Sequence, residues 1–347
     1  MLPANLTVGD SRPQPVIRQH ERKEDEPAHK DKRNIMARIY LPTPDSVATL
    51  AEDADSRPVT VEEFSQGHRN VDDPGVDLVV VLRGYFDDSS DAKRKRVAAV
   101  GGLVGHPLAW ADFEKRWSIA TYDLPGPFHA ADCDSNPPRG VFAGWSKERA
   151  NRLMKNLVGI ILDSQVKCFA SMVPIPDYRK VFPESGEYDP YILALKHTMI
   201  NMARVGAQLA QSHLEADGIA IWHENGDTTP EAVRIFQSLK ALSEWQDGRF
   251  LRVFAIGTKG LLPLQGADLI AREAFKLVDN IGKRPIRIPV QRIKMISSFH
   301  VWNKDCFEYL KANGGPSNLK VLTEWGYKEP PEIPSMTTYY QDSFDRR

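Results

Sequence analysis

The chain has 347 residues, of which 41% are hydrophobic and 26% are charged, and its formal net charge is -1. This composition is typical of a globular protein with one large domain or two small ones. A net charge so close to zero gives no overall attraction to nucleic acid, so contact with nucleic acid requires a local basic patch.

Cysteine spacing and hydropathy argue against several classes of protein. The three cysteines, Cys133, Cys168 and Cys306, are far apart and form no Cys-x-x-Cys pair, which disfavours a disulfide framework and a structural zinc site. No stretch of 18 consecutive apolar residues is present, so we expect no membrane-spanning helix and no membrane partner. Because the N-terminus also lacks the apolar core of a secretory signal, we expect a cytoplasmic protein.

The N-terminal part of the chain is predicted to be an appendage. Residues 1–35 are polar and include the charged run HERKEDEPAHKDKR, which offers few apolar side chains for burial. We therefore expect residues 1–76 to be disordered or loosely ordered. A core domain is predicted over residues 77–285, and a C-terminal extension over residues 286–347, where the pattern weakens to a basic stretch and a proline-rich tail.

The core domain opens with the segment LVVVLRGYFDDSSD at residues 78–91. Its continuous apolar run predicts a strand that is buried on both faces of a sheet. The run stops at Asp87 and Asp88, and two carboxylates about 4 Å apart repel each other by roughly 4 kcal/mol at an effective dielectric constant of 20. A cation, a shared proton or solvation must relieve that repulsion if both side chains point the same way. Alternatively, the Asp-Asp-Ser-Ser sequence makes a turn, since Asp and Ser hydrogen-bond their own backbone.

Strands and helices then alternate along the chain. A basic turn, DAKRKR, is followed by a second strand at residues 97–105, and the two strands are predicted to form an antiparallel hairpin. Further strands are predicted at residues 166–175, 218–227 and 251–257, and helices at residues 107–117, 146–165, 190–216, 230–245 and 263–281. Residues 124–145 are predicted to be a loop because of their glycines and prolines. This order predicts an α/β fold with a largely parallel sheet, whose strand ends form a crevice for a ligand.

Acidic residues occur at three of these element ends. They are Asp87 with Asp88 after the first strand, Glu224 with Asp227 after a central strand, and Asp268 in the first turns of the last predicted helix. Each has a structural explanation as well: a turn, a strand tip, or stabilisation of the helix dipole. Together they offer the oxygen ligands that Mg²⁺ prefers, and two such ions can clamp the reacting oxygens of a phosphodiester.

Several motifs resemble the bacterial domain-of-unknown-function family numbered 3800. The resemblance covers roughly residues 78–277, and its motifs are YFDDSS, FHAADC with a following GWS, YILALKHTM, HENGD and LPLQGADLIAREAFK. The last of these is the most specific. The family is similar to the RNase H-like superfamily, whose members carry acidic residues on the first strand, on a central strand and on a later helix. The resemblance therefore implies an RNase H-like mixed sheet flanked by helices, and a metal-dependent nuclease or a relative of one.

The resemblance also implies roles for individual residues. Asp87 matches the first-strand aspartate and Asp268 the helix aspartate, whereas Asp88 stands where the family more usually has Glu. The central acid is Glu224 in preference to Asp227.

Two further features lie close to these acids in the sequence. His129, in the predicted loop beside Asp132, is a candidate proton shuttle or ligand because histidine titrates near neutral pH, although a lone loop histidine is more often structural. The basic tip at Lys93–Arg96 is usually just solvated, but it lies a few residues from Asp87 and could contact a phosphate backbone.

Two functions from different classes follow. The first is hydrolysis of nucleic-acid phosphodiesters, with Asp87, Glu224 and Asp268 holding Mg²⁺ or Mn²⁺ and with Asp88 and Asp227 as auxiliary ligands. The second is a non-catalytic module that keeps the fold and uses the acidic cleft to bind a partner. Convergence of the acids around a cation favours the first, and acids that stay far apart favour the second.

Overall fold

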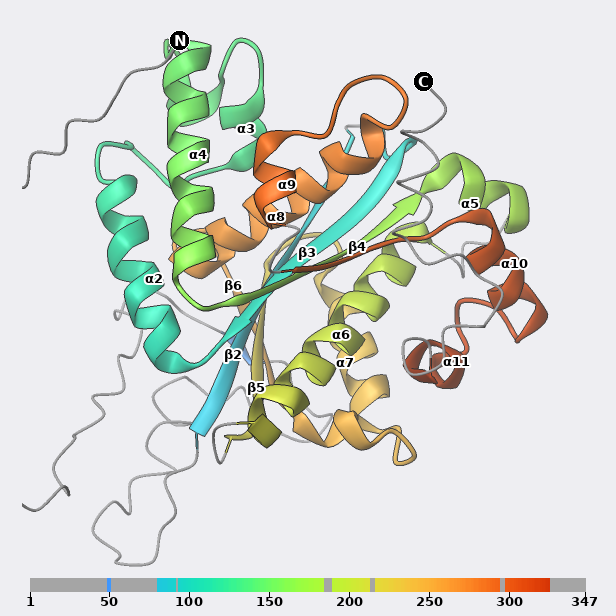
Figure 1. Ribbon diagram of the computed structural model, residues 1–347. Helices are drawn as coiled ribbons and strands as arrows, with labels where there is room; N and C mark the ends of the chain where they lie inside the picture. Colours follow the sequence, from blue (N-terminus) through green and yellow to red (C-terminus); the bar gives the residue numbers. More distant parts are fainter. Residues whose placement is uncertain are drawn as a thin grey trace, which may run out of the picture. The chain divides into compact units, whose positions relative to one another are not determined.

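One mixed sheet, in the order β1-β6-β5-β2-β3-β4-β7, organises the protein (Figure 1). The computed structural model describes residues 49–50, 80–91, 93–183, 189–212, 216–293 and 297–324, all within the unit Tyr40–Arg347. The strands are β1 (Thr49–Leu50), β2 (Val80–Ser90), β3 (Val97–Gly105), β4 (Lys167–Pro174), β5 (Ala216–Glu224), β6 (Leu251–Gly257) and β7 (Ser297–Val301).

Strand direction shows that the sheet is mixed. Strand β2 is parallel to β5, β5 is parallel to β6, and β4 is parallel to β7. Strand β3 runs antiparallel to both of its neighbours, β2 and β4. The predicted hairpin is therefore present, and the antiparallel pairing extends one strand further than the alternating pattern indicates. The prediction of an α/β fold with a mixed sheet flanked by helices is confirmed.

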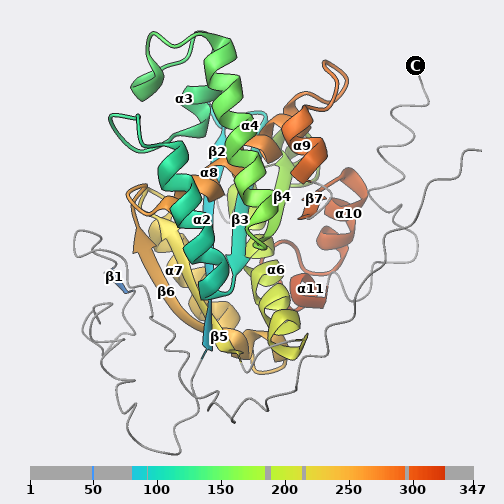
Figure 2. The same ribbon diagram turned by 60° about the vertical axis from the view of Figure 1, so that its left-hand side comes forward.

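Helices cover both faces of this sheet (Figure 2). The face that we call the α8 face packs against α2 (Pro107–Ala120), α3 (Ala130–Asp134), α4 (Lys147–Asp163), α8 (Leu262–Asp279) and α9 (Ile288–Ile293). The other face, which we call the α6 face, packs against α5 (Ile175–Val181), α6 (Pro190–Ser212), α7 (Thr229–Lys240), α10 (Lys304–Ala312) and α11 (Leu319–Glu324). Two short 3₁₀ turns, η1 (Gly140–Phe142) and η2 (Gln246–Phe250), complete the elements.

Alternation along β2 explains why its sequence is apolar without interruption. Tyr85 packs in the core of the α8 face and Phe86 in the core of the α6 face, because successive side chains of a strand point to opposite faces. Both faces are covered, so both sets of side chains are apolar. The same alternation directs Asp87 toward α8.

A glycine lets α8 approach the sheet closely at this point. Gly101 on β3 lies directly opposite Asp87 on β2. A Cβ atom added at Gly101 would lie 2.4 Å from the backbone nitrogen of Ala271 on α8. The α8 backbone therefore lies directly over β3, and Asp268 is one helical turn before this contact.

Beyond the predicted core domain, the C-terminal part adds to the same sheet and core. Strand β7 pairs with β4, and the indole Nε1 of the buried Trp302 donates a 2.9 Å hydrogen bond to Ser171 Oγ on β4. The sequence pattern does not predict β7 or the helices α9–α11, because they are short and lie in a basic, proline-containing stretch.

The structure also bears on the predicted loop, the predicted cap of α4, the predicted appendage and the membrane prediction. The predicted loop at residues 124–145 contains α3 and η1, and the predicted cap of α4 is present, with Ser146 Oγ accepting a hydrogen bond from Arg149 N. The predicted appendage, residues 1–76, lies outside the described residues apart from Thr49–Leu50. Of the helices in the described ranges, none is both long and apolar enough to cross a membrane.

Candidate functional site

Three carboxylates from remote parts of the chain meet around one lysine. The ammonium nitrogen of Lys259 lies 3.3 Å from Asp87 Oδ2, 3.2 Å from Glu224 Oε2 and 3.3 Å from Asp268 Oδ2. We call these four residues the acidic site. The three acids are the leading sequence-predicted candidates, and the structure brings them together.

Sheet geometry accounts for the convergence of Asp87 and Glu224. Phe86 on β2 is in register with His223 on the parallel strand β5, so the next residues, Asp87 and Glu224, lie side by side on the α8 face. Lys259 follows β6, which is parallel to β5 and ends at the same edge. Helix α8 then begins, and Asp268 on its second turn faces the strand ends.

Buried hydrogen bonds hold this arrangement in place. Gln265 on α8 donates from Nε2 to the carbonyl oxygen of Lys259 at 2.7 Å, and its Oε1 accepts from Trp117 Nε1 at 2.9 Å. Asp268 Oδ2 accepts from the backbone N–H of Ala130 at 2.7 Å. The lysine backbone and the helix aspartate are thus fixed by residues of α8, α2 and α3.

The acidic site is short of positive charge. The exposed fractions of Asp87 and Asp268 are 2% and 3%, and three carboxyl groups face one ammonium group. Burial, followed by the neighbouring Asp268 carboxylate, raises the pKa of Asp87 well above its usual range, although Lys259 opposes the shift. Burial opposes the charged form of Lys259, but the carboxylates of Asp268, Asp87 and Glu224 raise its pKa above the ordinary value.

One oxygen of Asp87 is a candidate metal ligand. Its Oδ1 accepts a hydrogen bond from Asp88 N at 2.7 Å, whereas its buried Oδ2 accepts no hydrogen bond within the described part of the chain and contacts Lys259 as an ion pair. Carboxylate oxygens are the ligands that Mg²⁺ and Mn²⁺ prefer, so the donor chemistry fits a divalent ion.

The distances, however, fit an ammonium group. Over the ranges that the structure describes, no group of three or more His, Cys, Asp or Glu side chains is arranged to hold a metal ion. A carboxylate oxygen lies about 2.0–2.1 Å from Mg²⁺, so the three carboxylates would have to close in by about 1 Å and the Lys259 ammonium would have to leave the centre.

The remaining predicted residues lie around the acidic site. Alternation along β2 directs Asp88 to the α6 face, and burial raises its pKa. Asp227 is exposed in the turn after β5. His129 precedes α3, and its Nδ1 lies 4.0 Å from Asp132 Oδ2, with 43% of its side chain exposed. Its neighbour Ala130 contacts the acidic site through the backbone.

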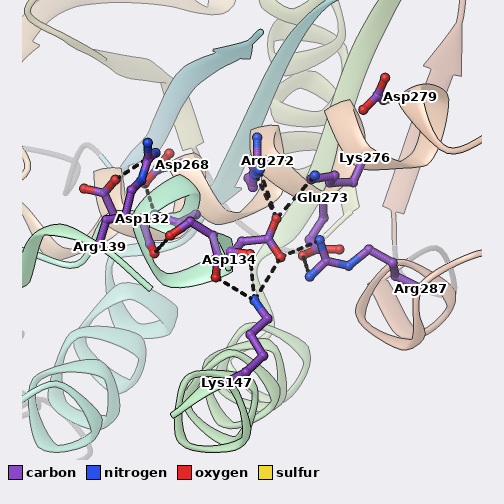
Figure 3. A network of polar contacts seen from close by, with 12 residues as sticks. Asp132, Asp134, Arg139, Lys147, Asp268, Arg272, Glu273, Lys276, Asp279 and Arg287 are labelled. Carbon is purple, nitrogen blue, oxygen red and sulfur yellow. Dashed lines mark hydrogen bonds and ion pairs between the residues drawn. The ribbon is translucent and has the colours of Figure 1, made fainter. Parts of the chain in front are cut away.

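A second charged centre lies one turn further along α8, where four cationic side chains converge on Asp134 from α8, α4 and the segment before α9 (Figure 3). We call it the basic cluster, and its members are Asp134, Lys147, Arg272, Glu273, Lys276 and Arg287. Asp134 Oδ2 lies 2.9 Å from Arg272 Nη2, and its Oδ1 lies 2.8 Å from Arg287 Nη1. Although burial opposes it, Arg287 and then Arg272 hold the pKa of Asp134 below its usual range.

Glu273 is the other carboxylate of the basic cluster and is fully buried. Its Oε1 lies 3.1 Å from Arg287 Nη2. Burial raises the pKa of Glu273 to about 7, against the opposing effect of Arg287. The carboxyl group of Glu273 is therefore expected to gain or lose its proton near neutral pH.

Sequence reasoning did not find Lys259 or the role of Asp134. Lys259 stands in the turn GTKG, where a lysine is ordinarily solvated, and Asp134 stands in a proline-rich segment with no periodicity. The position of Lys259 between an apolar strand and the motif LPLQGAD could have predicted its place in the acidic site, because the turn that carries it must lie at the strand ends. Cys133, next to Asp134, is fully buried in the core of the α8 face.

Comparisons with known proteins add little to this geometry. No family model matches the sequence, and no curated protein matches it. Among solved structures, the chain is similar to a chain in the structure of the PCNA:RNase HII complex from Archaeoglobus fulgidus, with 11% sequence identity and a TM-score of 0.33. The match covers 62% of this chain and 87% of that chain.

Proposed function

We propose that this protein is a divalent-metal-dependent hydrolase that cleaves phosphodiester bonds of nucleic acid. The observation that carries the proposal is the convergence of Asp87, Glu224 and Asp268 on a single point at the ends of parallel strands. Crevices at such strand ends are the usual ligand sites of open α/β sheets. The raised pKa of the buried Asp87 also supports a functional site, since carboxyl groups with perturbed pKa values cluster at such sites.

Asp87, Glu224 and Asp268 would hold Mg²⁺ or Mn²⁺ in the proposed enzyme. When bound, the ion supplies Lewis-acid activation of a phosphoryl oxygen and lowers the pKa of a water molecule. The chain itself orients the carboxylates through Gln265 and Ala130. The Lys259 side chain, on a turn between Thr258 and Gly260, would swing aside, while its carbonyl stays bonded to Gln265.

The resemblance to the bacterial domain-of-unknown-function family numbered 3800 is part of this proposal. Its motif FHAADC lies at α3, where Ala130 N donates to Asp268, and its motif LPLQGADLIA supplies both Gln265 and Asp268. Two motifs far apart in the chain thus meet at the acidic site, which supports their assignment to one function.

The alternative is a non-catalytic binding module, and Lys259 is the observation that favours it. An ammonium group already lies at the centre of the three carboxylates, so an internal cation could replace the metal permanently. The two functions differ in one measurable respect, which is whether a divalent ion displaces Lys259.

The test combines thermal melting with cleavage. Mn²⁺ should raise the melting temperature, since a ligand at a hundredfold excess over its Kd stabilises the native state by about 2.7 kcal/mol, and it should start cleavage of a panel of RNA, DNA and hybrid substrates. Asp87→Asn and Asp268→Asn should abolish both effects while folding normally. Asp268→Asn should be slightly more stable than the parent without metal, because it removes one repelling charge.

Asp177→Asn is the matched control, because it removes one exposed carboxylate from α5 on the α6 face and should leave both effects intact. A protein that shows neither a Mn²⁺-dependent shift nor cleavage is the binding module. Cleavage that persists in Asp87→Asn would place the activity elsewhere in the chain or in a contaminant.

A further inference from the structure

A groove of about 380 Å³ lies along the outer surface of α4, on the α8 face of the molecule. Its walls come from α2, α4 and α9. Its lining includes Arg116, Arg152, Lys155, Gly159, Asp163 and Arg292. The groove is separate from the acidic site and from the basic cluster, since it shares no lining residue with either.

The groove carries excess positive charge. Four of its lining side chains are cationic and one is a carboxylate. That carboxylate, Asp163, is already engaged by Arg116 at 2.8 Å. Lys155 and Arg292 form no ion pair with any residue that the structure describes. The groove therefore offers at least two cations to an anionic ligand.

A glycine opens the groove. Arg152, Lys155 and Gly159 lie on one side of α4, because residues three or four apart in a helix are neighbours. A Cβ atom added at Gly159 would meet nothing within 4 Å. Glycine within a helix costs roughly 0.5–1 kcal/mol relative to alanine. At Gly159 that cost in helix stability accompanies open space beside the helix.

We propose that this groove binds the phosphate backbone of a nucleic-acid strand. The proposal rests on the proposed function, because the strand is the polymer that the acidic site would cleave. With a net charge of -1, the chain attracts nucleic acid only through a local basic patch, and the groove is such a patch. The groove is open and its lining on α4 runs from Arg152 to Asp163, which suits a polymer better than a small enclosed anion.

The basic cluster and the groove share the helix α4 and the region of α9. Lys147 stands at the first position of α4 and Arg287 just before α9, so both helices that wall the groove lead to Asp134. Arg272 follows Asp268 by four residues on α8, or about 6 Å along the helix. Phosphate contacts at Lys155 and Arg292 would fix the register of a strand without reading its sequence.

Binding of a fluorescent single-stranded oligonucleotide in EDTA tests the proposal without cleavage. The double variant Lys155→Gln, Arg292→Gln should bind severalfold more weakly at low salt. The slope of log K against log salt should fall in magnitude by about 1.4, which is about 0.7 for each lost phosphate contact on a single strand. Lys304→Gln, Lys311→Gln is the matched control, because it removes two exposed charges from α10 on the opposite face and should change neither quantity.

A second pair of variants separates charge from folding. Gly159→Gln and Gly159→Glu add side chains of equal size into open space, and both should fold because glycine disfavours the helix. Gly159→Glu should weaken binding more than Gly159→Gln. Equal affinity of the parent, the double variant and Gly159→Glu would overturn the proposal. Full displacement of the strand by inorganic phosphate at an equal concentration of phosphate groups would overturn it too, since the groove would then be a site for small anions.

Failure of the proposed function gives a different result. Asp268→Asn should retain strand binding in EDTA, because its effect is on metal binding and cleavage. Groove-dependent binding without any metal-dependent cleavage would leave this inference standing and remove the nuclease. Metal-dependent cleavage with binding that ignores the groove variants would do the reverse.

Discussion

The acidic site and the basic cluster are near inverses of each other on the same helix. In the acidic site one ammonium group lies among three carboxyl groups, whereas in the basic cluster four cations surround Asp134, and one of them, Arg287, also contacts Glu273. Asp87 and Asp134 are both largely buried, and burial acts on each in the same direction. The pKa of Asp87 is nevertheless raised and that of Asp134 lowered.

The difference shows that neighbours, and not burial alone, decide the state of a buried aspartate. Asp134 has its lone pairs engaged and its charge compensated several times over, so it acts as a structural hub that joins α3 to α8, α4 and the segment before α9. Asp87 has one oxygen that accepts no hydrogen bond among the described residues and too little positive charge nearby. Only the second situation leaves a demand for a further cation.

The largest effect is expected from a change that disturbs both centres at once. Gly101→Ala places a Cβ atom 2.4 Å from the Ala271 nitrogen, where a backbone atom cannot yield. It should displace α8 and destabilise the protein by about 5 kcal/mol, or prevent folding, as overpacking at a backbone contact can. Urea unfolding measures the loss. Gly159→Ala is the control, because its open position should gain about 0.5–1 kcal/mol. A Gly101→Ala protein with the parent stability would mean that α8 does not lie against β3.

Breaking the basic cluster should have the next largest effect. Asp134→Asn keeps the shape of the side chain but leaves four cations without their common partner. Removal of one member of a buried ion pair costs about 3–5 kcal/mol, so we expect about 4 kcal/mol by chemical denaturation. The exposed pair Lys180–Asp177 is the comparison, since Asp177→Asn there should cost less than about 1 kcal/mol. Equal losses at the two sites would show that Asp134 is not a hub.

The protonation of Glu273 should be visible in the pH dependence of stability. Its pKa is about 7 in the folded protein and 4.5 as the ordinary value. The folded state therefore keeps this proton to higher pH, and the stability that the group contributes below pH 4.5 is lost as pH rises through 7. The free energy of unfolding should fall by about 3 kcal/mol over this range from this group alone. In Glu273→Gln, measured by urea unfolding at pH 5, 6, 7 and 8, that part of the slope should vanish. An unchanged slope would assign the titration to other groups.

The smallest of these effects concerns the acidic site. Lys259→Met removes the only cation within ion-pair distance of all three acids in the described part of the chain. In EDTA it should cost about 2 kcal/mol, the scale of leaving a buried charged group without its partner. Excess Mn²⁺ should restore the melting temperature if the metal replaces the ammonium group. Lys283→Met removes an exposed lysine near the end of α8 and should melt like the parent under both conditions. A Lys259→Met protein as stable as the parent in EDTA would show that the carboxylates do not need this cation.

Much of the fold follows from patterns that are local in the sequence. The strand β6 occurs at the predicted residues. The N-terminal cap of α4 and the buried strand before Asp87 could also be predicted, because each depends on residues that are adjacent in the sequence. The three acids could be foreseen to converge because the sequence places each near a strand end or a helix start, although β2 itself continues past Asp87 to Ser90. Local patterns alone were sufficient for that step.

Long-range contacts explain what the sequence could not predict. Lys259 and Asp134 each contact partners over a hundred residues away, such as Asp87 for the lysine and Arg272 for the aspartate, and local sequence patterns do not reveal such contacts. The close approach of α8 to β3 depends on Gly101. The residues around that glycine give no indication that a helix beginning at residue 262 packs against it. Strand β7 is five residues long and takes its place from β4.

The place of β7 in the sheet also determines how long one edge of β4 stays unpaired while the chain is synthesised. Strand β4 is complete once Pro174 emerges, but its outer partner begins at Ser297, about 120 residues later. At about 5–20 residues per second, the ribosome needs roughly 6–25 s to supply that partner. During this interval the hydrogen-bonding groups on one side of β4 are available to any other extended chain. The unpaired edge of β4 is therefore an aggregation risk during synthesis, and the short β7 removes it by pairing with β4.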